Sequence, residues 1–481
     1  MVNIDDSDST TKLQPRLARR LGLFDATMIV MGGIIGSGIF MNPSVVARQV
    51  TTPFLILGVW VLGGLVALIA AFIWAELAAL RPEVGGQYAY LREAYHPLVA
   101  FLYGWGLLLV IQTGGMAAVA VTFARYFLEL TRAPVSDSVV AMTALGGLTL
   151  INCLGVRTGS TVQSVLMVLK ILAIIALIGC GFFLVIPQTG SVGEAIAPVA
   201  LLDQPASFDL ITAVGAAMVP VLFAFGGWQT ASFVAGEIRD ARKNLPRALV
   251  VGVIGVIVLY LAVNFVCLRV LGVAGLAATS TPASDVMRFA LGPAGARALA
   301  AGIAISTLGF LSQGMLTAPR VYFAMAKDGL FFKSVGRLHP KTQVPIIAIA
   351  LQGILAMIIA RSGSYDKILN YVVSVDFIFF GATAVCIFVF RRREAAVAQP
   401  FGRASSAATP PHALPDGRAA APSDVGRITR VPGHPLTTLA FIAICWLVVI
   451  NTVYRYPENT LIGLAILVAG IPFFFFWRRR Q

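Results

Sequence analysis

Long apolar segments, separated by short polar connections, fill most of this 481-residue chain. A helix that crosses a bilayer needs about 20 consecutive, mostly apolar residues. By this measure the sequence predicts twelve membrane-spanning segments, at approximately 24–47, 53–80, 98–128, 138–156, 161–186, 209–236, 247–272, 295–325, 344–361, 366–390, 436–454 and 459–478. We therefore expect an all-α polytopic membrane protein.

The first apolar segment contains glycines where a continuous helix should run, namely Gly32, Gly33, Gly36 and Gly38. Glycine costs about 1 kcal/mol relative to alanine inside a helix. At membrane depth, non-helical backbone is tolerated only where it is buried in protein or lines a cavity. A break at Gly36-Ser37-Gly38 would free the carbonyls of Gly32 to Ile35 and the N–H groups of Ser37 to Phe40. Such groups suit an ammonium and a carboxylate, which a free amino acid carries together.

The sixth segment repeats this feature with Pro220, Gly226 and Gly227 in its middle. Proline removes a helical hydrogen bond, and the glycine pair weakens the helix further. Segments 1 and 6 each begin a set of five, so the second set enters the membrane in the opposite orientation. Close packing of small residues, or a kinked helix, would explain either segment alone. Interruptions at matching places in two inverted halves favour a transporter's binding site.

Composition and charge agree with a membrane protein. Hydrophobic residues make up 58% of the chain and charged residues 12%, against about 25% charged residues in soluble domains. The net charge is +14. With both termini cytoplasmic, most Lys and Arg residues fall on the cytoplasmic side, as the positive-inside rule requires. The basic charge therefore indicates topology and contact with anionic lipid, and no nucleic-acid partner is expected.

The predicted spans divide the chain into five parts. A cytoplasmic tail (1–22) precedes a first repeat of five helices (23–208) and a second, inverted repeat (209–393). Residues 394–433 are rich in Ala, Pro, Ser and Arg and predict a flexible cytoplasmic loop. The last part, 434–481, holds two further helices and a basic C-terminal tail.

Two charged residues lie deep in apolar segments. Lys170 is about nine residues, or roughly 13 Å of helix, inside segment 5. That depth is too great for easy snorkelling and suggests a function with a partner. Burial favours a neutral lysine and nearby carbonyls favour an ammonium, so Lys170 is a candidate for coupling transport to protons. Asp376 could carry a proton, face a polar substrate group or pair locally. Glu76 and Glu237 lie beside arginines at helix ends, which favours structural or gating ion pairs.

Several stretches resemble the amino acid–polyamine–organocation superfamily, and within it the L-type amino acid transporter branch and its bacterial relatives. They occur in the family's order: Gly33–Phe40, Glu76–Tyr90, Phe101–Trp105, Asn152–Arg157, Phe223–Trp228, Glu237–Asp240 with Lys243–Arg247, and Arg320–Gly329. The resemblance implies the LeuT-like fold, with a five-plus-five inverted repeat, two peripheral helices, and helices 1 and 6 broken.

The resemblance also implies roles for individual residues. The substrate carboxylate would meet the N–H groups and hydroxyl around Ser37 and Gly38. The aromatic that closes over substrate would be Phe223, and Gln229 would line the side-chain pocket. Related transporters have a lysine on helix 5, as at Lys170, near an ion site of sodium-coupled relatives. The ammonium would meet carbonyls of Ile34, Ile35, Phe223, Ala224 and Gly226.

The sequence therefore predicts a secondary active L-amino acid permease of the bacterial inner membrane, working by alternating access as a proton symporter. The small apolar pocket residues favour a neutral substrate. An exchanger is a second interpretation of the transport mode, and Asp376 keeps a permease for cationic amino acids or polyamines open.

Other functions and partners fit less well. The chain has no G-x-x-x-x-G-K-[ST] nucleotide loop, which argues against a primary pump. A membrane-embedded enzyme would need paired acid–base or metal-ligating groups, and a channel would not need two broken helices. All histidines lie in polar connections, so no metal or cofactor is expected. The loop Glu129–Ser138 has no cysteine, so we expect no disulfide-linked glycoprotein subunit of the kind that animal members of the superfamily bind.

Overall fold

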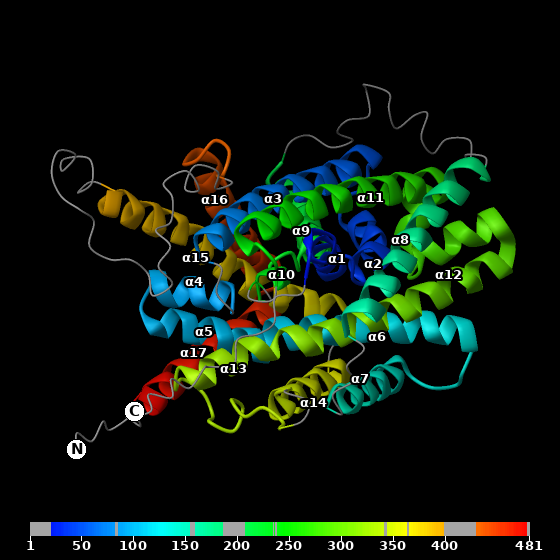
Figure 1. The fold of residues 1–481 in the computed structure, drawn as a ribbon. Coiled ribbons are helices and arrows are strands. Elements are labelled where there is room, and N and C mark those ends of the chain that lie inside the picture. The colour runs from blue at the N-terminus through cyan, green and yellow to red at the C-terminus, as the bar shows by residue number, and fades with distance from the viewer. Residues whose placement is uncertain are drawn as a thin grey trace, which may run out of the picture.

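The computed structural model describes residues 21–81, 85–153, 159–185, 207–233, 235, 238–340, 344–362, 365–398 and 430–478. Within these ranges the chain is helical and forms no strand, apart from an isolated bridge between Leu21 and Ile238. The helices, labelled in Figure 1, are α1 (Leu23–Ile34), α2 (Gly38–Gln49), α3 (Pro53–Leu80), α4 (Gln87–Ala94), α5 (Pro97–Gly106), a π-helix (Leu107–Ile111), α6 (Gln112–Thr131), α7 (Asp137–Cys153), α8 (Gly159–Phe183), α9 (Phe208–Phe225), α10 (Thr230–Phe233), α11 (Ala241–Ala278), α12 (Pro282–Thr317), α13 (Pro319–Lys327), α14 (Ile346–Ser362), α15 (Tyr365–Ala398), α16 (Leu436–Arg455) and α17 (Pro457–Arg478).

Lipid explains why only helices form, because hydrocarbon offers no water to pair with exposed backbone groups. Among the described residues, nine helical stretches are long and apolar enough to cross a membrane. Shorter apolar helices at Asp137–Cys153, Met167–Phe183 and Ile346–Arg361 fall on three further predicted segments. The helical, membrane-spanning class is therefore confirmed, while the count of twelve spans stays a prediction.

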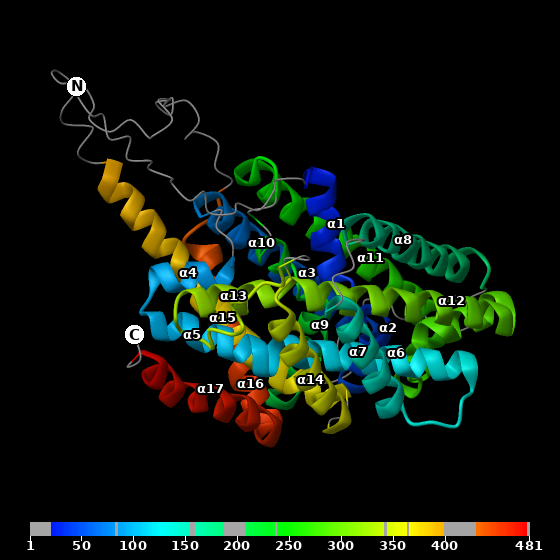
Figure 2. The same ribbon diagram turned by 60° about the horizontal axis from the view of Figure 1, so that its bottom comes forward.

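The short helices α1, α2, α9 and α10 occupy the middle of the bundle (Figures 1 and 2). On one side α3 packs along α11, and both contact the central helices. On another side α6 packs along α12, with α7 and α14 outside them. Helices α16 and α17 lie at the edge, against α15 and α5. This arrangement buries both interrupted segments inside protein.

The outer faces of the helices are apolar. Large exposed side chains include Leu447 and Ile450 on α16, and Leu461 and Ile462 on α17, each more than half exposed. Contiguous apolar surface of this kind is unfavourable in water and marks a membrane or partner interface. Together with the span lengths, it places these faces against lipid.

Ion pairs hold the end of the bundle that carries α4. The buried Glu76 carboxylate accepts hydrogen bonds from the Arg391 guanidinium at 2.6 and 2.7 Å and from the Val431 N–H at 2.7 Å. The ion-pair interpretation of Glu76 is thus confirmed, but its partner lies 315 residues away in sequence. The nearby Arg81 instead pairs with Glu93 at 2.7 Å. Glu76 therefore joins α3, α15 and the segment before α16.

Two predicted segments have different bounds in the structure. Segments 247–272 and 295–325 lie within longer helical runs, α11 and α12–α13. Within them the backbone leaves helical geometry at Gly272 (φ 66°) and Gly292 (φ 67°), a left-handed region that favours glycine. Short helical pieces follow Gly272 and precede Gly292. The piece before Gly292 contains Ser284, Asp285 and Arg288, which a count of apolar residues excludes, whereas the piece after Gly272 is apolar and is set apart by the change of backbone direction at that glycine.

The predicted loop at 394–433 also needs correction at its start. Helix α15 continues through Glu394 to Ala398, because this stretch keeps good helix formers. Residues 399–429 lie outside the described part of the chain, as do Glu237 and most of the N-terminal tail (1–20).

Candidate functional site

The first apolar segment is interrupted where its glycines predict. Helix α1 ends at Ile34 and α2 begins at Gly38. Among the described residues, the N–H groups of Ser37, Gly38 and Ile39 donate to no backbone carbonyl. The buried Ser37 hydroxyl likewise has no hydrogen-bond partner there. The N–H of Phe40 is not free, contrary to our expectation, because the turn tightens and it donates to Ser37 O at 3.0 Å.

The sixth segment is interrupted between Phe225, the end of α9, and Thr230, the start of α10. Gly227 has a φ of 106°, which a residue with a side chain rarely adopts. Its N–H donates to Gln229 Oε1 at 3.0 Å, and its carbonyl accepts from Thr230 Oγ1 at 2.8 Å. Helix α9 runs through Pro220 without ending, so the glycine pair and not the proline sets the break.

The two breaks touch each other through glycines. A Cβ atom built on Gly33 would lie 2.6 Å from the Gly227 carbonyl oxygen. A Cβ on Gly38 would lie 2.6 Å from the Cα and Cβ of Ala224. Both distances are far below van der Waals contact, so glycine is required for this approach of α1 and α2 to α9 and its break. The glycines of these segments therefore serve both purposes that the sequence suggested: they allow close packing between helices, and they lie at the helix breaks.

Tyr260 of α11 joins the two breaks. Its buried hydroxyl lies 3.2 Å from both the Ile34 and the Ala224 carbonyl oxygens. These carbonyls are among those assigned to the substrate ammonium, so part of their capacity is already used. This role could not be predicted from the sequence, because a tyrosine within an apolar segment is usually a packing residue.

We predict that Tyr260→Phe lowers transport while the protein still folds. The variant keeps the ring and removes the donor shared by the two breaks. A lost buried hydrogen bond costs about 1–3 kcal/mol, so uptake should fall by between about fivefold and a hundredfold if the contact supports the transport cycle. Initial uptake rates in liposomes, at equal amounts of protein, measure the effect. Wild-type rates would make Tyr260 a packing residue.

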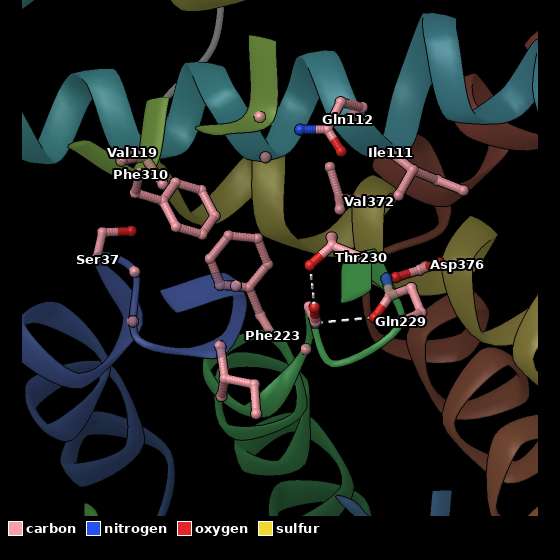
Figure 3. Close-up of a pocket in the computed structure, with 18 of the residues that line it drawn as sticks. Ser37, Ile111, Gln112, Val119, Phe223, Gln229, Thr230, Phe310, Val372 and Asp376 are labelled. Atoms are coloured by element: carbon pink, nitrogen blue, oxygen red, sulfur yellow. Dashed lines mark hydrogen bonds between the residues drawn. The ribbon is translucent and has the colours of Figure 1, made fainter. Parts of the chain in front are cut away.

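A cavity of about 100 Å³ lies at the two breaks (Figure 3). One water needs roughly 10–15 Å³ in this measure, so a small molecule fits. Seven of the ten predicted site residues line it: Ile34, Ser37, Gly38, Phe223, Gly226, Gln229 and Asp376. The other three, Ile35, Ala224 and Lys170, are not among the lining residues. The structure thus brings residues from α1, α2, α9 and α15 to one place.

Lys170 is not among the residues that line the cavity, but it contacts the first break. Its ammonium donates to the Ile35 carbonyl at 2.6 Å, and the residue is 5% exposed. The contact connects α8 to the non-helical residues between α1 and α2. From its depth in segment 5, Lys170 was expected to have a polar partner, and the Ile35 carbonyl is such a partner.

Several lining residues were missed by the sequence reasoning, namely Gln112, Thr230, Phe310, Gln313 and Thr317. Phe310 of α12 faces Phe223 across the cavity (Figure 3). Gln112 follows the π-helix that interrupts the run from Pro97 to Thr131, and such π-helical turns are frequent at functional sites. Gln112 and Gln313 could have been noticed from the sequence, because a glutamine within an apolar segment is unusual. That their side chains face the cavity could not be predicted without knowing how the helices pack.

Broken helices that meet in mid-bundle, with a buried cavity at the breaks, are typical of membrane transporters that hold a small substrate. A family model described as "Amino acid permease" matches residues 21–472. The chain belongs to this family. It is therefore a multi-pass membrane transporter of the amino acid–polyamine–organocation superfamily and not an enzyme.

Individual proteins that are similar to this chain are also amino acid transporters by name. The chain is 30% identical over 383 residues to the serine/threonine exchanger SteT of Bacillus subtilis, covering 78% of this chain and 84% of the relative. It is 27% identical over 474 residues to the large neutral amino acids transporter small subunit 2 of Homo sapiens (96% and 82%). It is 30% identical over 390 residues to the b(0,+)-type amino acid transporter 1 of Mus musculus (79% and 77%).

Proposed function

We propose that the protein carries L-amino acids across the bacterial plasma membrane by alternating access. The observation that supports this most is the set of unpaired polar groups at the start of α2: the Ser37 hydroxyl and the N–H groups of Ser37 and Gly38. A helix N-terminus favours a carboxylate by its dipole and its free donors. The carbonyl ends of α1 and α9 favour the ammonium. The cavity thus offers complementary groups to both ends of a zwitterion.

The proposed architecture is LeuT-like, with inverted repeats at 23–208 and 209–393 and peripheral helices in 434–481. It is supported by breaks in the first helix of each set and by the peripheral position of α16 and α17. Both termini would be cytoplasmic. Because the loop Glu129–Ser138 lacks a cysteine, the protein would work without a disulfide-linked subunit.

Proton symport is our proposed mode, with Lys170 as the coupling residue. Exchange is the second candidate, because one relative is named an exchanger. The apolar Ile34, Phe223 and Leu222 lie beside the main-chain donors at the start of α2, which leaves the choice of substrate side chain to the rest of the cavity. These residues surround the main-chain end of the proposed substrate position.

Uptake into liposomes that contain the purified protein tests the proposal. A panel of labelled amino acids is offered with and without internal amino acid, and with and without an inward proton gradient. Accumulation driven by the gradient alone supports symport. Uptake that needs internal substrate supports exchange. A protein that binds and transports no amino acid under any condition would refute the proposal.

Phe223→Ala should lower transport by roughly tenfold, the equivalent of about 1.4 kcal/mol in the barrier. The ring lines the cavity and lies edge-on to Tyr365, with centroids 6.5 Å apart. An aromatic lid excludes water and strengthens the polar contacts beneath it. The measurement is the uptake rate relative to the amount of inserted protein. Unchanged kinetics would reduce Phe223 to a packing role.

A further inference from the structure

The cavity has a charged end that the proposed zwitterion contacts do not use. Figure 3 shows Ser37 at one end and Asp376 near the other, with Phe223 and Phe310 between them. Asp376 comes from α15 and is the one titratable side chain among the described cavity-lining residues. Across the described chain its carboxylate has neither an ion-pair partner nor a hydrogen bond. It is therefore open to a ligand.

An ionised carboxylate that is largely shielded from water is costly, because the charge loses hydration; it is stabilised either by a proton or by a cationic partner. Lys170, the cation of the proposed coupling mechanism, does not line the cavity and donates to Ile35 O. The protein's described side chains thus leave the Asp376 charge uncompensated. A positively charged ligand group would compensate it.

The surroundings of Asp376 match such a group. Gln229 lies beside it in Figure 3, with its Oε1 already accepting from Gly227 N. Gln112 and Gln313 line other parts of the cavity, and Gln313 Oε1 faces Gly32 of α1. Carboxylate and amide oxygens accept the several N–H donors of an ammonium or guanidinium. This end of the cavity therefore presents a carboxylate and an amide side by side.

The middle of the cavity suits an aliphatic stem. Phe223 and Phe310 bring their rings to the space between the main-chain end and Asp376. A flexible methylene chain can pack on such rings while its charged head reaches polar groups beyond them. Basic amino acids have this order of parts: a zwitterionic head, an aliphatic stem and a cationic end.

We propose that Asp376 selects amino acids with a cationic side chain, such as arginine and lysine. The inference rests on the proposed function, since it assumes that the zwitterion binds at the helix breaks. The carboxylate pairs with the side-chain cation, and the Gln229 amide oxygen accepts from one of its remaining donors. A substrate with an apolar end leaves these groups unpaired, which a site built for polar contacts penalises.

The first test compares ligands on the wild-type protein, so it needs no variant to fold. Arginine and citrulline have nearly the same shape and differ in the charge at the end of the side chain. Lysine and norleucine form a second such pair. We expect the basic member of each pair to bind about tenfold to a hundredfold more tightly, the usual range for a hydrogen bond to a charged group. Equal affinities within both pairs would overturn the inference.

The second test uses Asp376→Asn, which keeps the shape and removes the charge. Affinity for arginine should fall by the same factor, while affinity for leucine should not fall. Asp376→Glu should retain the preference for arginine over citrulline. The matched control is Asp209→Asn, which alters an exposed aspartate in the first turn of α9 and should change neither affinity.

The outcomes separate this inference from the function on which it rests. Equal losses for arginine and leucine in Asp376→Asn would overturn selection and assign Asp376 a structural or proton-carrying role. Binding of neutral amino acids alone would also overturn it, while leaving amino acid transport intact. Binding of no amino acid of any class would instead refute the proposed function.

Discussion

Gly38→Val should reduce transport to background while the protein still inserts in the membrane. A Cβ atom at this position would lie 2.6 Å from both the Cα and the Cβ of Ala224, and valine adds two further methyl groups. Helix α2 would have to move away from α9. The donors at Ser37 and Gly38 would then no longer face the carbonyl ends of α1 and α9. A zwitterion could not meet both sets of groups at once.

Two glycine variants serve as controls for this prediction. Gly147→Val alters an exposed face of α7 where a Cβ meets nothing within 4 Å, so insertion and uptake should be retained. Gly115→Ala adds a methyl group that lines the cavity without any clash, and should alter substrate affinity more than folding. Detergent-solubilised protein that elutes as one species shows that each variant folds. Wild-type uptake by a well-folded Gly38→Val protein would contradict the proposed site.

A glycine at position 38 that lies beside a substrate carboxylate could also be required because a side chain there would fill the space of the substrate. The structure directs the Cβ of Gly38 onto Ala224 instead. The difference arises because a glycine pattern shows that the backbone is approached closely, but not by what. In this chain the approaching group is another helix, and the substrate contacts lie on the N–H side of the same residues.

The breaks in the first and sixth segments could be predicted because they follow from local chemistry. Glycines weaken a helix wherever they occur, and a pair such as Gly226-Gly227 leaves few alternatives in an apolar segment. The spans were predictable for a similar reason, since lipid demands long apolar runs. Even so, the second break lies after Pro220 and not at it, because a helix can absorb one missing hydrogen bond when its neighbours pack around it.

The remaining site residues depend on packing between distant segments. Tyr260 and Phe310 lie in apolar stretches where nothing distinguishes a residue that faces the cavity from one that faces lipid. Arg391 forms its ion pair with Glu76 across 315 residues, so the closer Arg81 was the natural guess from sequence. Which residues face the cavity and which ion pairs form depend on how the helices are arranged, and local composition does not determine that arrangement. The sequence showed that Lys170 and Asp376 lie deep in apolar segments, but it could not show which neighbouring groups their side chains face.

Lys170→Met should remove accumulation driven by a proton gradient. The ammonium of Lys170 donates to the Ile35 carbonyl at 2.6 Å and so fastens α8 to the non-helical residues between α1 and α2. A neutral amine can make only a weaker contact, because a hydrogen bond from a charged donor is roughly twice as strong as a neutral one. Gain and loss of the proton can therefore shift the balance between two conformations of the first break. Methionine keeps the length of the side chain and cannot carry the proton.

The decisive measurement compares two modes of transport in the same liposomes. Exchange of internal for external amino acid needs no net charging cycle, so it should survive in Lys170→Met while gradient-driven accumulation is lost. Lys367→Met is the matched control, because it removes an exposed lysine of α15 and should leave both modes unchanged. If Lys170→Met still accumulates substrate when the proton gradient is the sole driving force, Lys170 is not the coupling residue. If the wild-type protein ignores that gradient, the protein is an exchanger, and Lys170 is a fixed cation that holds the break between α1 and α2 in place.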